Sequence, residues 1–510
     1  MVTDADRGRK AGSVTIPAPT LGLNTRDAWA GMDPRYAVSM VNMIPTPSSV
    51  ELRKGFALQS RITNSATGQD LNVFQGFVKY GPDGLWIKGT RTSATFVELL
   101  EDVFSGTEVT SFDAYSGLGT AYVNFTNPAG SFLIVVGQEY WTYNGVVWTD
   151  NSASVTGRPT TLGDVTAHRG RLWFTGLNTT DAYYLPVNAL TGALVKFPLG
   201  PLMTSGGSLY YVTTWTVDGG EGGADDRIIF VTSAGQVIVY AGTDPSSQST
   251  WALVGVYNLS EPVGRPLRFG PDVLLPMRDG LYSMTEILRG NTGSEYAISS
   301  AIRKDWQALN QEGIFYPSKV TSVYSSKFNV VMFNFVTSNA ASTGNQTSVQ
   351  LVMNTLTKGW TKFTGLDAYV IGEASGDIYF ANVTGGGASN VYKWGTATDD
   401  NGSPITGYCS QAYNYLGSPG ALKVVTGILP SFTVTGTHTV GFALDADFQQ
   451  AITTSTSPTN DTSYAAGSYR QMLHYPTAGD ALSIFCEVSS SASGFNWYNT
   501  GLLAMVGGVV

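Results

Sequence analysis

The stretch from Gly206 to Asn258 reads GGSLYYVTTWTVDGGEGGADDRIIFVTSAGQVIVYAGTDPSSQSTWALVGVYN and decides the fold class. Two apolar runs, RIIFVT and QVIVYAG, flank the tight turn Ser233-Ala234-Gly235, and Trp251 closes the unit. Glycine permits the positive φ of a tight turn, while β-branched and aromatic residues favour a pleated, half-buried surface. The pattern therefore predicts a hairpin followed by a further strand, as in one blade or sheet.

Similar units recur along the chain. Strand-like runs such as FVKY and LWIKGT, FLIVVG and YWTY, and AYVIGEA and IYFANV flank further turns. Those turns are Pro82-Asp83-Gly84, Asn144-Gly145, His168-Arg169-Gly170, Arg278-Asp279-Gly280 and Ser375-Gly376-Asp377. Their spacing is uneven, whereas propeller families repeat every 40 to 50 residues or so, and the number of blades does not follow from it. We expect a mainly β fold, a propeller-like array of antiparallel blades with an additional C-terminal β domain and few helices.

Length and composition favour an assembled protein. The chain has 510 residues, which exceeds the size of a single core and predicts two or three structural units. It contains 59 glycines, and only 13% of its residues are charged, against about 25% in ordinary soluble domains. The glycines suit many short strands joined by tight turns. A weakly charged surface is typical of a protein that is covered in a homo-oligomer or particle.

The net charge of −9 argues against a basic groove that grips nucleic acid, because phosphate binding relies on clustered Lys and Arg. Cys409 and Cys486 are the two cysteines of the chain, which excludes a disulfide scaffold and predicts two reduced, core-like thiols. Reduced thiols indicate the cytosol as the place of assembly.

The N-terminal residues MVTDADRGRKAGSV lack the apolar core of a secretory signal and are interpreted as a flexible arm. No run reaches the 18 or so apolar residues that cross a bilayer, so we expect no membrane-spanning segment. One helix is expected, because Ile298, Ile302, Trp306 and Leu309 form an apolar stripe at helical spacing and Ser299 or Ser300 is suited to cap it. That helix is interpreted as core-packing, with contact to a neighbouring subunit as the alternative.

No catalytic, cofactor or metal site is expected. The three histidines, His168, His438 and His474, lack a second His or Cys at the short spacing that holds zinc. His168 is interpreted as a hydrogen-bonded or exposed turn residue rather than a general base. Neither a Gly-x-Ser-x-Gly elbow nor a phosphate-cradling loop is present.

The acidic, glycine-rich loop from Asp218 to Asp226 is the best candidate for a special site. Its carboxylates Asp218, Glu221, Asp225 and Asp226 lie in nine residues and offer the oxygen ligands that calcium prefers. The spacing differs from that of the 12-residue calcium loop, and a solvated connection between strands is the simpler interpretation. Whether the loop binds calcium is left open by the sequence.

A glycan-binding or sialidase-like propeller is a further alternative. Sialidases resemble one another through Ser-x-Asp-x-Gly-x-Thr-Trp turns, and the segment from Asn144-Gly145 to Trp148 lacks that spacing. Aromatic side chains stack on sugars, but tryptophans at recurrent strand positions are more often the core between blades. The tryptophans concerned are Trp86, Trp141, Trp148, Trp173, Trp215 and Trp251.

Several segments resemble structural proteins from the tails of short-tailed bacteriophages. The first is PAPTLGLNTRDAWAGMDPRYAVSMVNMIPTPSSVELRKGF at 17–56, followed by RLWFTGLNTTDAYYLPV at 171–187 and the quoted stretch at 206–258. VMNTLTKGWTKFTGLDAYVIGEASGDIYFANV at 352–383 and YNYLGSPGALKVVTGILPSF at 413–432 extend the likeness over most of the chain. These segments are structural patterns and contain no reactive motif.

The family that the chain resembles is the podovirus tail nozzle, also called tail hub or distal tail-tube protein. This resemblance implies a virion protein that is assembled in the host cytoplasm as a homo-hexameric ring with β-propeller domains. The ring would dock below the head–tail adaptor ring and contact a tail fibre or a tip (needle) protein. It would retain the packaged genome and pass double-stranded DNA during ejection without binding it tightly. The alternative is a receptor- or glycan-binding tail component.

We divide the chain into an N-terminal arm and extended segment (1–56), a propeller-like body (57–400) and a C-terminal β domain (401–510). The last boundary follows from the polar, turn-rich sequence ATDDNGSP, which is typical of a linker. A net charge of −9 per chain suits a channel that repels DNA, and we hypothesise that the loop 218–226 contributes to the lining or rim of that channel.

Overall fold

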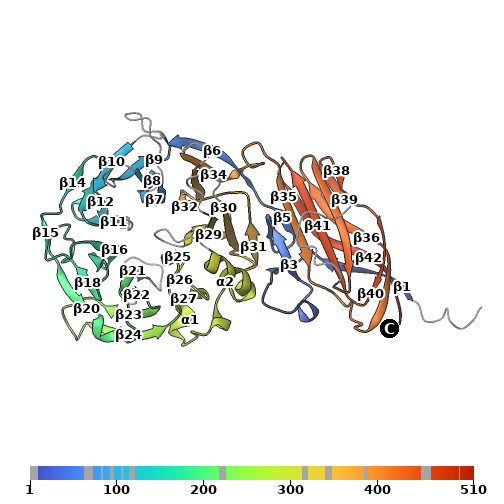
Figure 1. Ribbon diagram of the computed structural model, residues 1–510, viewed down its shortest axis with the longest axis horizontal. Helices are drawn as coiled ribbons and strands as arrows, with labels where there is room; N and C mark the ends of the chain where they lie inside the picture. The colour runs from blue at the N-terminus through green and yellow to red at the C-terminus, as the bar shows by residue number, and fades with distance from the viewer. Residues whose placement is uncertain are drawn as a thin grey trace, which may run out of the picture.

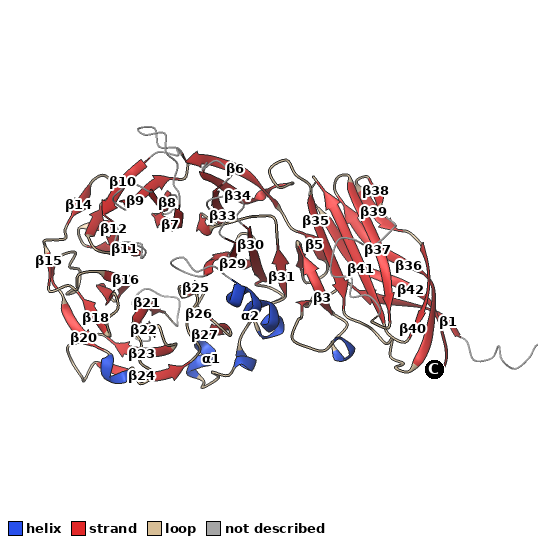
Figure 2. Ribbon diagram, in the orientation of Figure 1, coloured by secondary structure: helices blue, strands red, loops and turns tan. Residues whose placement is uncertain are grey.

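A computed structural model gives the fold. The structure describes residues 10–62, 73–81, 84–91, 97–104, 108–113, 121–216, 226–312, 320–338, 347–383, 389–448, 461–492 and 494–509. Strands dominate this part of the chain, and the helices are few and short (Figure 2). The expected mainly β class is confirmed.

A ring of antiparallel sheets surrounds an axis and forms a β-propeller (Figure 1). Within the described residues, five blades are separate four-stranded sheets, and two further sectors of the ring are β25–β27 and β28–β31. The first three blades are β7 (Val73–Tyr80), β8 (Gly84–Arg91), β9 (Val97–Asp102) and β10 (Glu108–Asp113); β11 (Ala121–Asn127), β12 (Gly130–Val136), β13 (Tyr140–Tyr143) and β14 (Trp148–Asp150); and β16 (Leu162–His168), β17 (Arg171–Gly176), β18 (Asp181–Tyr184) and β20 (Val195–Pro198).

The stretch quoted first is one complete blade. It comprises β21 (Leu209–Trp215), β22 (Arg227–Thr232), β23 (Gln236–Gly242) and β24 (Trp251–Asn258), with Gly235 at φ 85° in the predicted turn. The two central strands are apolar without alternation, because the sheet packs against a neighbouring blade on each face. The remaining sectors are β25 (Leu267–Phe269), β26 (Asp272–Met277) and β27 (Gly280–Ser283); β28 (Val320–Ser325), β29 (Val330–Ser338), β30 (Thr347–Asn354) and β31 (Trp360–Phe363); and β32 (Val370–Ala374), β33 (Asp377–Val383), β34 (Ser389–Ala397) and β6 (Gly55–Ile62).

The N-terminal strand β6 closes the ring. It pairs with β34 as the outer strand of the last blade, so that Ser389 lies opposite Ile62. On the inner side, β32 contacts β7, the first strand of the first blade. The ring is therefore held shut by a sheet that joins distant parts of the chain.

Tight turns form where the sequence predicts them. Arg169 and Gly170 have φ values of 49° and 66°, and Ser375 and Gly376 have 52° and 82°. Two consecutive positive φ values are typical of the type I′ turns that join antiparallel strands. Residues 82–83 of the turn at Pro82-Asp83-Gly84 lie outside the described residues.

The expected helix exists but begins later than predicted. A 3₁₀ turn, η5 (Ser300–Ile302), precedes α2 (Arg303–Glu312), and Ile298 lies before both. Ile302 and Trp306 are fully buried against the core, which confirms the core-packing interpretation. The other short elements are α1 (Met284–Leu288), η2 (Trp29–Gly31), η3 (Gly200–Leu202), η4 (Ser294–Tyr296) and the parallel pair β15 (Val155–Thr156) and β19 (Gly192–Ala193).

A β-sandwich lies beside the propeller and contains both ends of the described chain (Figure 1). Its C-terminal strands are β35 (Ile405–Gln411), β36 (Ala421–Val434), β37 (His438–Ala446), β38 (Thr462–Tyr464), β39 (Gly467–Arg470), β40 (Leu473–Gly479), β41 (Leu482–Ser490) and β42 (Phe495–Val509). Its N-terminal strands are β1 (Lys10–Pro17), β2 (Gly22–Leu23), β3 (Tyr36–Val41), β4 (Met43–Pro45) and β5 (Val50–Leu52).

From Lys10 onward, the N-terminal segment is part of the sandwich and not a separate extended segment, contrary to the division at residues 1–56, while residues 1–9 of the expected arm lie outside the described residues. β1 pairs with β42 over its whole length, from Lys10 opposite Val506 to Pro17 opposite Asn499. β3 pairs with β35, and β5 with β42. The segment forms strands because its partners are supplied by the far end of the sequence, and the propeller, whose strands run from Gly55 to Ala397, is an insertion into the sandwich.

Candidate functional site

The axial cavity of the propeller is the main candidate site. It has a volume of about 620 Å³ and is lined from the innermost strand of every sector, β7, β11, β16, β21, β25, β28 and β32, or the residues beside it. Tyr122, Tyr210 and Tyr324 contribute polar rings, and Leu and Val side chains contribute apolar walls. A cavity of this size and mixed lining is in the range of sites that hold small molecules.

Two ion pairs cross the cavity wall between sectors. Lys79 Nζ on β7 lies 3.2 Å from Glu373 Oε2 on β32. Arg265 donates a hydrogen bond to the buried carboxylate of Asp164 on β16, and Asp164 also accepts one from the backbone N–H of Val212. Burial raises the pKa of Asp164, and the charge of Arg265 opposes that rise.

Arg268 is the third cation that lines the cavity. The Arg268 side chain lines the cavity and is exposed to solvent. Within the described residues it forms no ion pair. Burial and, second, the charge of Arg265 lower the pKa of the Arg268 guanidinium, and Asp226 opposes that change. The cavity therefore contains two arginines close enough to repel each other, and among the described residues one of them, Arg268, has no carboxylate at contact distance.

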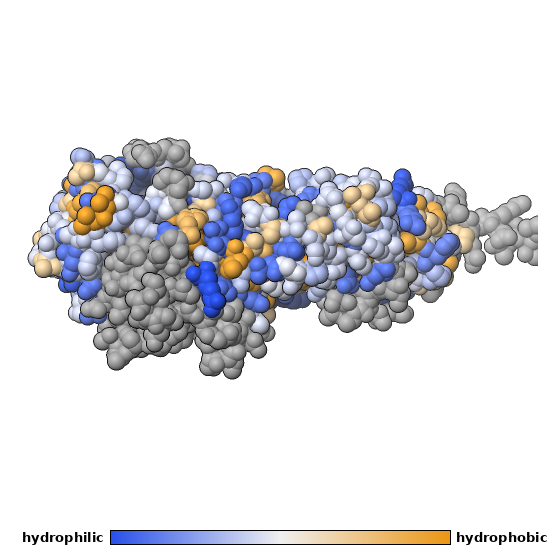
Figure 3. Space-filling view, turned by 90° about the horizontal axis from the view of Figure 1, so that it is seen from above, coloured by the Kyte–Doolittle hydropathy of each residue, from blue (hydrophilic) through white to orange (hydrophobic). Residues whose placement is uncertain are grey.

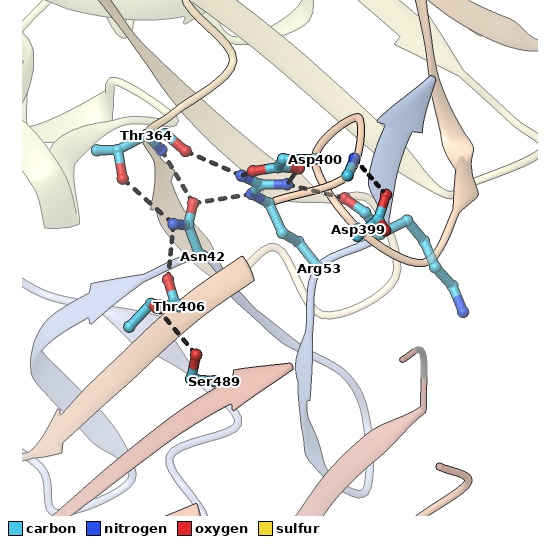
Figure 4. Close-up of polar contacts among 9 residues, drawn as sticks. Asn42, Arg53, Thr364, Asp399, Asp400, Thr406 and Ser489 are labelled. Atoms are coloured by element: carbon cyan, nitrogen blue, oxygen red, sulfur yellow. Dashed lines mark hydrogen bonds and ion pairs between the residues drawn. The ribbon is translucent and has the colours of Figure 1, made fainter. Parts of the chain in front are cut away.

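The junction between the propeller and the sandwich is the second polar site (Figure 4). Arg53, which follows β5, is 1% exposed, and its two Nη atoms form an ion pair with Asp400 at 2.8 and 2.6 Å. Its remaining N–H groups donate to Asn42 Oδ1 and to the carbonyl oxygens of Lys54 and Thr364 at 2.9 to 3.0 Å. All five donors of the guanidinium are satisfied, which is the condition for burying such a charge.

Asn42 extends this cluster into the sandwich. Its Nδ2 donates to Thr406 O on β35, and its Oδ1 accepts from the backbone N–H of Thr364 at the end of β31. Backbone hydrogen bonds also cross the junction, because one ten-stranded sheet runs from β28 through β31, β2, β3 and β35 to β38. Blade and sandwich thus share backbone pairing and a buried ion pair.

The predicted candidates are dispersed. His168 is the last residue of β16 and is buried, with Nδ1 hydrogen-bonded to Thr214 Oγ1 at 2.7 Å. His438 is buried beside Gly436 O, and His474 lies exposed on β40. Among the described residues, no three His, Cys, Asp or Glu side chains form a group suited to a metal ion.

The two cysteines, although 77 positions apart, are direct neighbours. Cys409 on β35 and Cys486 on β41 are register partners, and both are free and fully buried. Burial raises the pKa of both thiols. The core-like interpretation is confirmed, while their pairing had no signal in the local sequence.

Most of the acidic loop lies outside the described residues. Asp226 is 6% exposed, and its Oδ1 has no hydrogen-bond partner in the part of the chain that the structure describes. The tryptophans lie between blades, as expected of core residues. Trp173 of β17 stacks on Trp251 of β24 with ring centroids 5.5 Å apart, and Trp86 of β8 packs against Trp148 of β14.

The structure predicts how His168 responds to pH. Burial lowers the pKa of His168 from 6.5 to about 3, so the folded protein keeps the ring neutral while the unfolded chain binds a proton. His168 therefore does not lower the free energy of unfolding above pH 6.5. As the pH drops from 6.5 toward 3, protonation of His168 in the unfolded chain lowers that free energy, by about 2 kcal/mol at about pH 5. In urea denaturation from neutral pH down to about pH 5, His168→Asn should remove this slope. The exposed control His474→Asn should retain it, and equal slopes in both variants would contradict the assignment.

No protein-family model matches the sequence, and no curated protein does. Two solved structures similar to the chain are BBS1N in complex with ARL6DN and the β-propeller domain of Cps50 (Swd1) from Myceliophteria thermophila. The first has a TM-score of 0.40 and 9% identity and covers 68% of this chain and 99% of its own. The second has a TM-score of 0.40 and 8% identity and covers 66% and 99%. By its own sheets, the protein is a β-propeller protein with a β-sandwich domain.

Proposed function

We propose that the chain is a structural subunit of the tail of a short-tailed bacteriophage, in the position of the tail nozzle. Six copies form a ring that is the distal part of the DNA channel. The ring retains the packaged genome, lies below the adaptor ring, and offers contacts for a fibre or tip protein. The segments at 17–56, 171–187, 206–258, 352–383 and 413–432 carry the resemblance that suggests this position.

The continuous junction between the two domains is the structural observation that supports the proposal. Domains within one chain usually move against each other unless their interface is large and well packed. Here the ten-stranded sheet and the Arg53–Asp400 pair leave no hinge between blade and sandwich. A subunit that resists the pressure of packaged DNA needs such a junction, because a hinge would let the channel wall yield.

The surface suits contacts within an assembly. Val146 and Val147, at the turn between β13 and β14, are 83% and 55% exposed. On the face seen in Figure 3, hydrophobic residues form small patches among hydrophilic ones. Small apolar patches with polar surroundings are typical of the contacts between subunits. Among the described residues, no helix is long and apolar enough to cross a membrane.

The purified full-length chain, alone and with its neighbouring tail ring, tests the proposal by native mass spectrometry and negative-stain microscopy. We expect rings of six copies with a central hole, joined by head-to-tail contacts. Such rings should show no appreciable affinity for duplex DNA at low salt, because each chain carries a net charge of −9. Isolated propellers that bind glycans would favour the receptor-binding alternative, and a stoichiometry other than six would contradict the nozzle position.

A further inference from the structure

We propose that the axial cavity of the propeller is a binding site for a small organic anion, which Arg268 and Arg265 hold by its carboxylate or phosphate group. The inference rests on the cavity of a single chain. It is independent of ring formation and of the role in a phage tail.

The charges that line the cavity are not balanced. Lys79 has a carboxylate partner in Glu373, and Arg265 has one in Asp164. Arg268 has none at contact distance among the described residues, since Asp226 raises its pKa only from farther away. The charge of Arg265 lowers the pKa of Arg268, which shows that the two guanidinium groups repel each other, and an anion bound beside both of them in the cavity offsets that repulsion.

Arginine also fits the geometry of the proposed ligand. Its planar fork donates two parallel hydrogen bonds to a carboxylate or phosphate, and such charge-assisted bonds are stronger than neutral ones. The Arg265 side chain is 41% exposed although it pairs with Asp164, so part of its fork remains open to a ligand. The two arginines therefore recognise the anionic group rather than a neutral sugar.

The rest of the cavity favours a molecule larger than an ion. The volume of about 620 Å³ exceeds that of a phosphate ion and admits a group of the size of a sugar ring. Tyr122, Tyr210 and Tyr324 line it with rings that stack on a sugar or donate to its hydroxyls. A sugar acid or a sugar phosphate combines both features.

Isothermal titration calorimetry on the full-length protein tests the site with three probes: inorganic phosphate, glucuronate and uncharged glucose. We expect saturable binding of phosphate or glucuronate and weaker binding of glucose. Tighter binding of glucuronate than of phosphate would identify a sugar acid, and the reverse order a phosphate ester. Absence of saturable binding of both anions by the wild-type protein would overturn the proposal.

Arg268→Gln should weaken anion binding about tenfold or more, because it removes the charge while retaining hydrogen-bonding capacity. Arg268→Lys should fall between Arg268→Gln and the wild type, because it keeps the charge without the fork. The control Arg289→Gln removes a cation that is 66% exposed on α1's C-terminal side and should bind like the wild type. Unchanged melting temperatures show that each variant is folded. Equal affinity of Arg268→Gln and wild type would exclude Arg268 from the site.

Discussion

Arg53→Met is expected to lower the free energy of unfolding by about 3–5 kcal/mol, because it breaks a buried ion pair by removing one partner. The substitution leaves Asp400, whose side chain is 13% exposed, without its bidentate partner. It also leaves the carbonyl oxygens of Lys54 and Thr364 without the donors that satisfy them. A buried carboxylate without a partner costs more than the pair contributed. Urea denaturation followed by tryptophan fluorescence measures the loss.

A matched control separates burial from charge. Arg35 also pairs with an aspartate, Asp33, at 2.7 Å, but the two side chains are 60% and 38% exposed. Arg35→Met should therefore cost far less than Arg53→Met, because solvent screens an exposed ion pair. The double variant Arg53→Met with Asp400→Leu should regain part of the stability, because it removes the orphaned charge. Equal losses in Arg35→Met and Arg53→Met would show that the junction cluster has no special weight.

Trp173→Ala should destabilise the propeller by about 3–5 kcal/mol, as large-to-small changes of buried aromatic residues do. The Trp173 side chain is fully buried between two blades. Its ring stacks on Trp251 at an interplanar angle of 8° and meets the edge of Phe230 at 5.8 Å. Alanine leaves a cavity that the two rigid sheets cannot close, whereas Trp173→Phe fills part of it and should cost less.

The control for this variant is Trp29→Ala. Trp29 lies in η2, is 36% exposed, and has its ring 6.4 Å from that of Tyr413. We expect a smaller loss than for Trp173→Ala, because a third of the Trp29 side chain is already in contact with water in the folded protein. A comparable shift of the denaturation midpoint in Trp29→Ala and Trp173→Ala would contradict a special role of the contact between blades.

Local signals explain which parts of the fold were predictable. The hairpin turns at Gly235 and Gly376 are predictable because a backbone with positive φ favours glycine, and glycine is visible in the sequence. The apolar spacing predicts the helix around Trp306 but places its start before Arg303, where α2 begins. Residues Ser300–Ile302 form a 3₁₀ turn, and the apolar stripe does not distinguish that turn from an α-helix.

The N-terminal strand β1 and the axial cavity are not predictable from local sequence, because both depend on contacts between distant segments. Lys10–Pro17 is a strand only because Phe495–Val509 lies beside it, and nothing in its own composition reveals that partner. The candidate site was missed for the same reason. Arg265 and Arg268 follow no motif, and they become neighbours of Lys79 and Asp164 only once the ring has closed around its axis.

The insertion of the propeller between two halves of the sandwich has a consequence for biosynthesis. β6 is made before every other strand of the propeller, yet its partner β34 emerges after all the other blades. The partner of β1 is β42, which is translated later than β34. Such long-range pairing makes folding slow, because loop entropy is lost before the contacts form. The early strands β1, β3 and β6 thus leave the ribosome with unpaired edges, which are prone to aggregate. The propeller is complete only after β34 has been translated, and the sandwich only after β42.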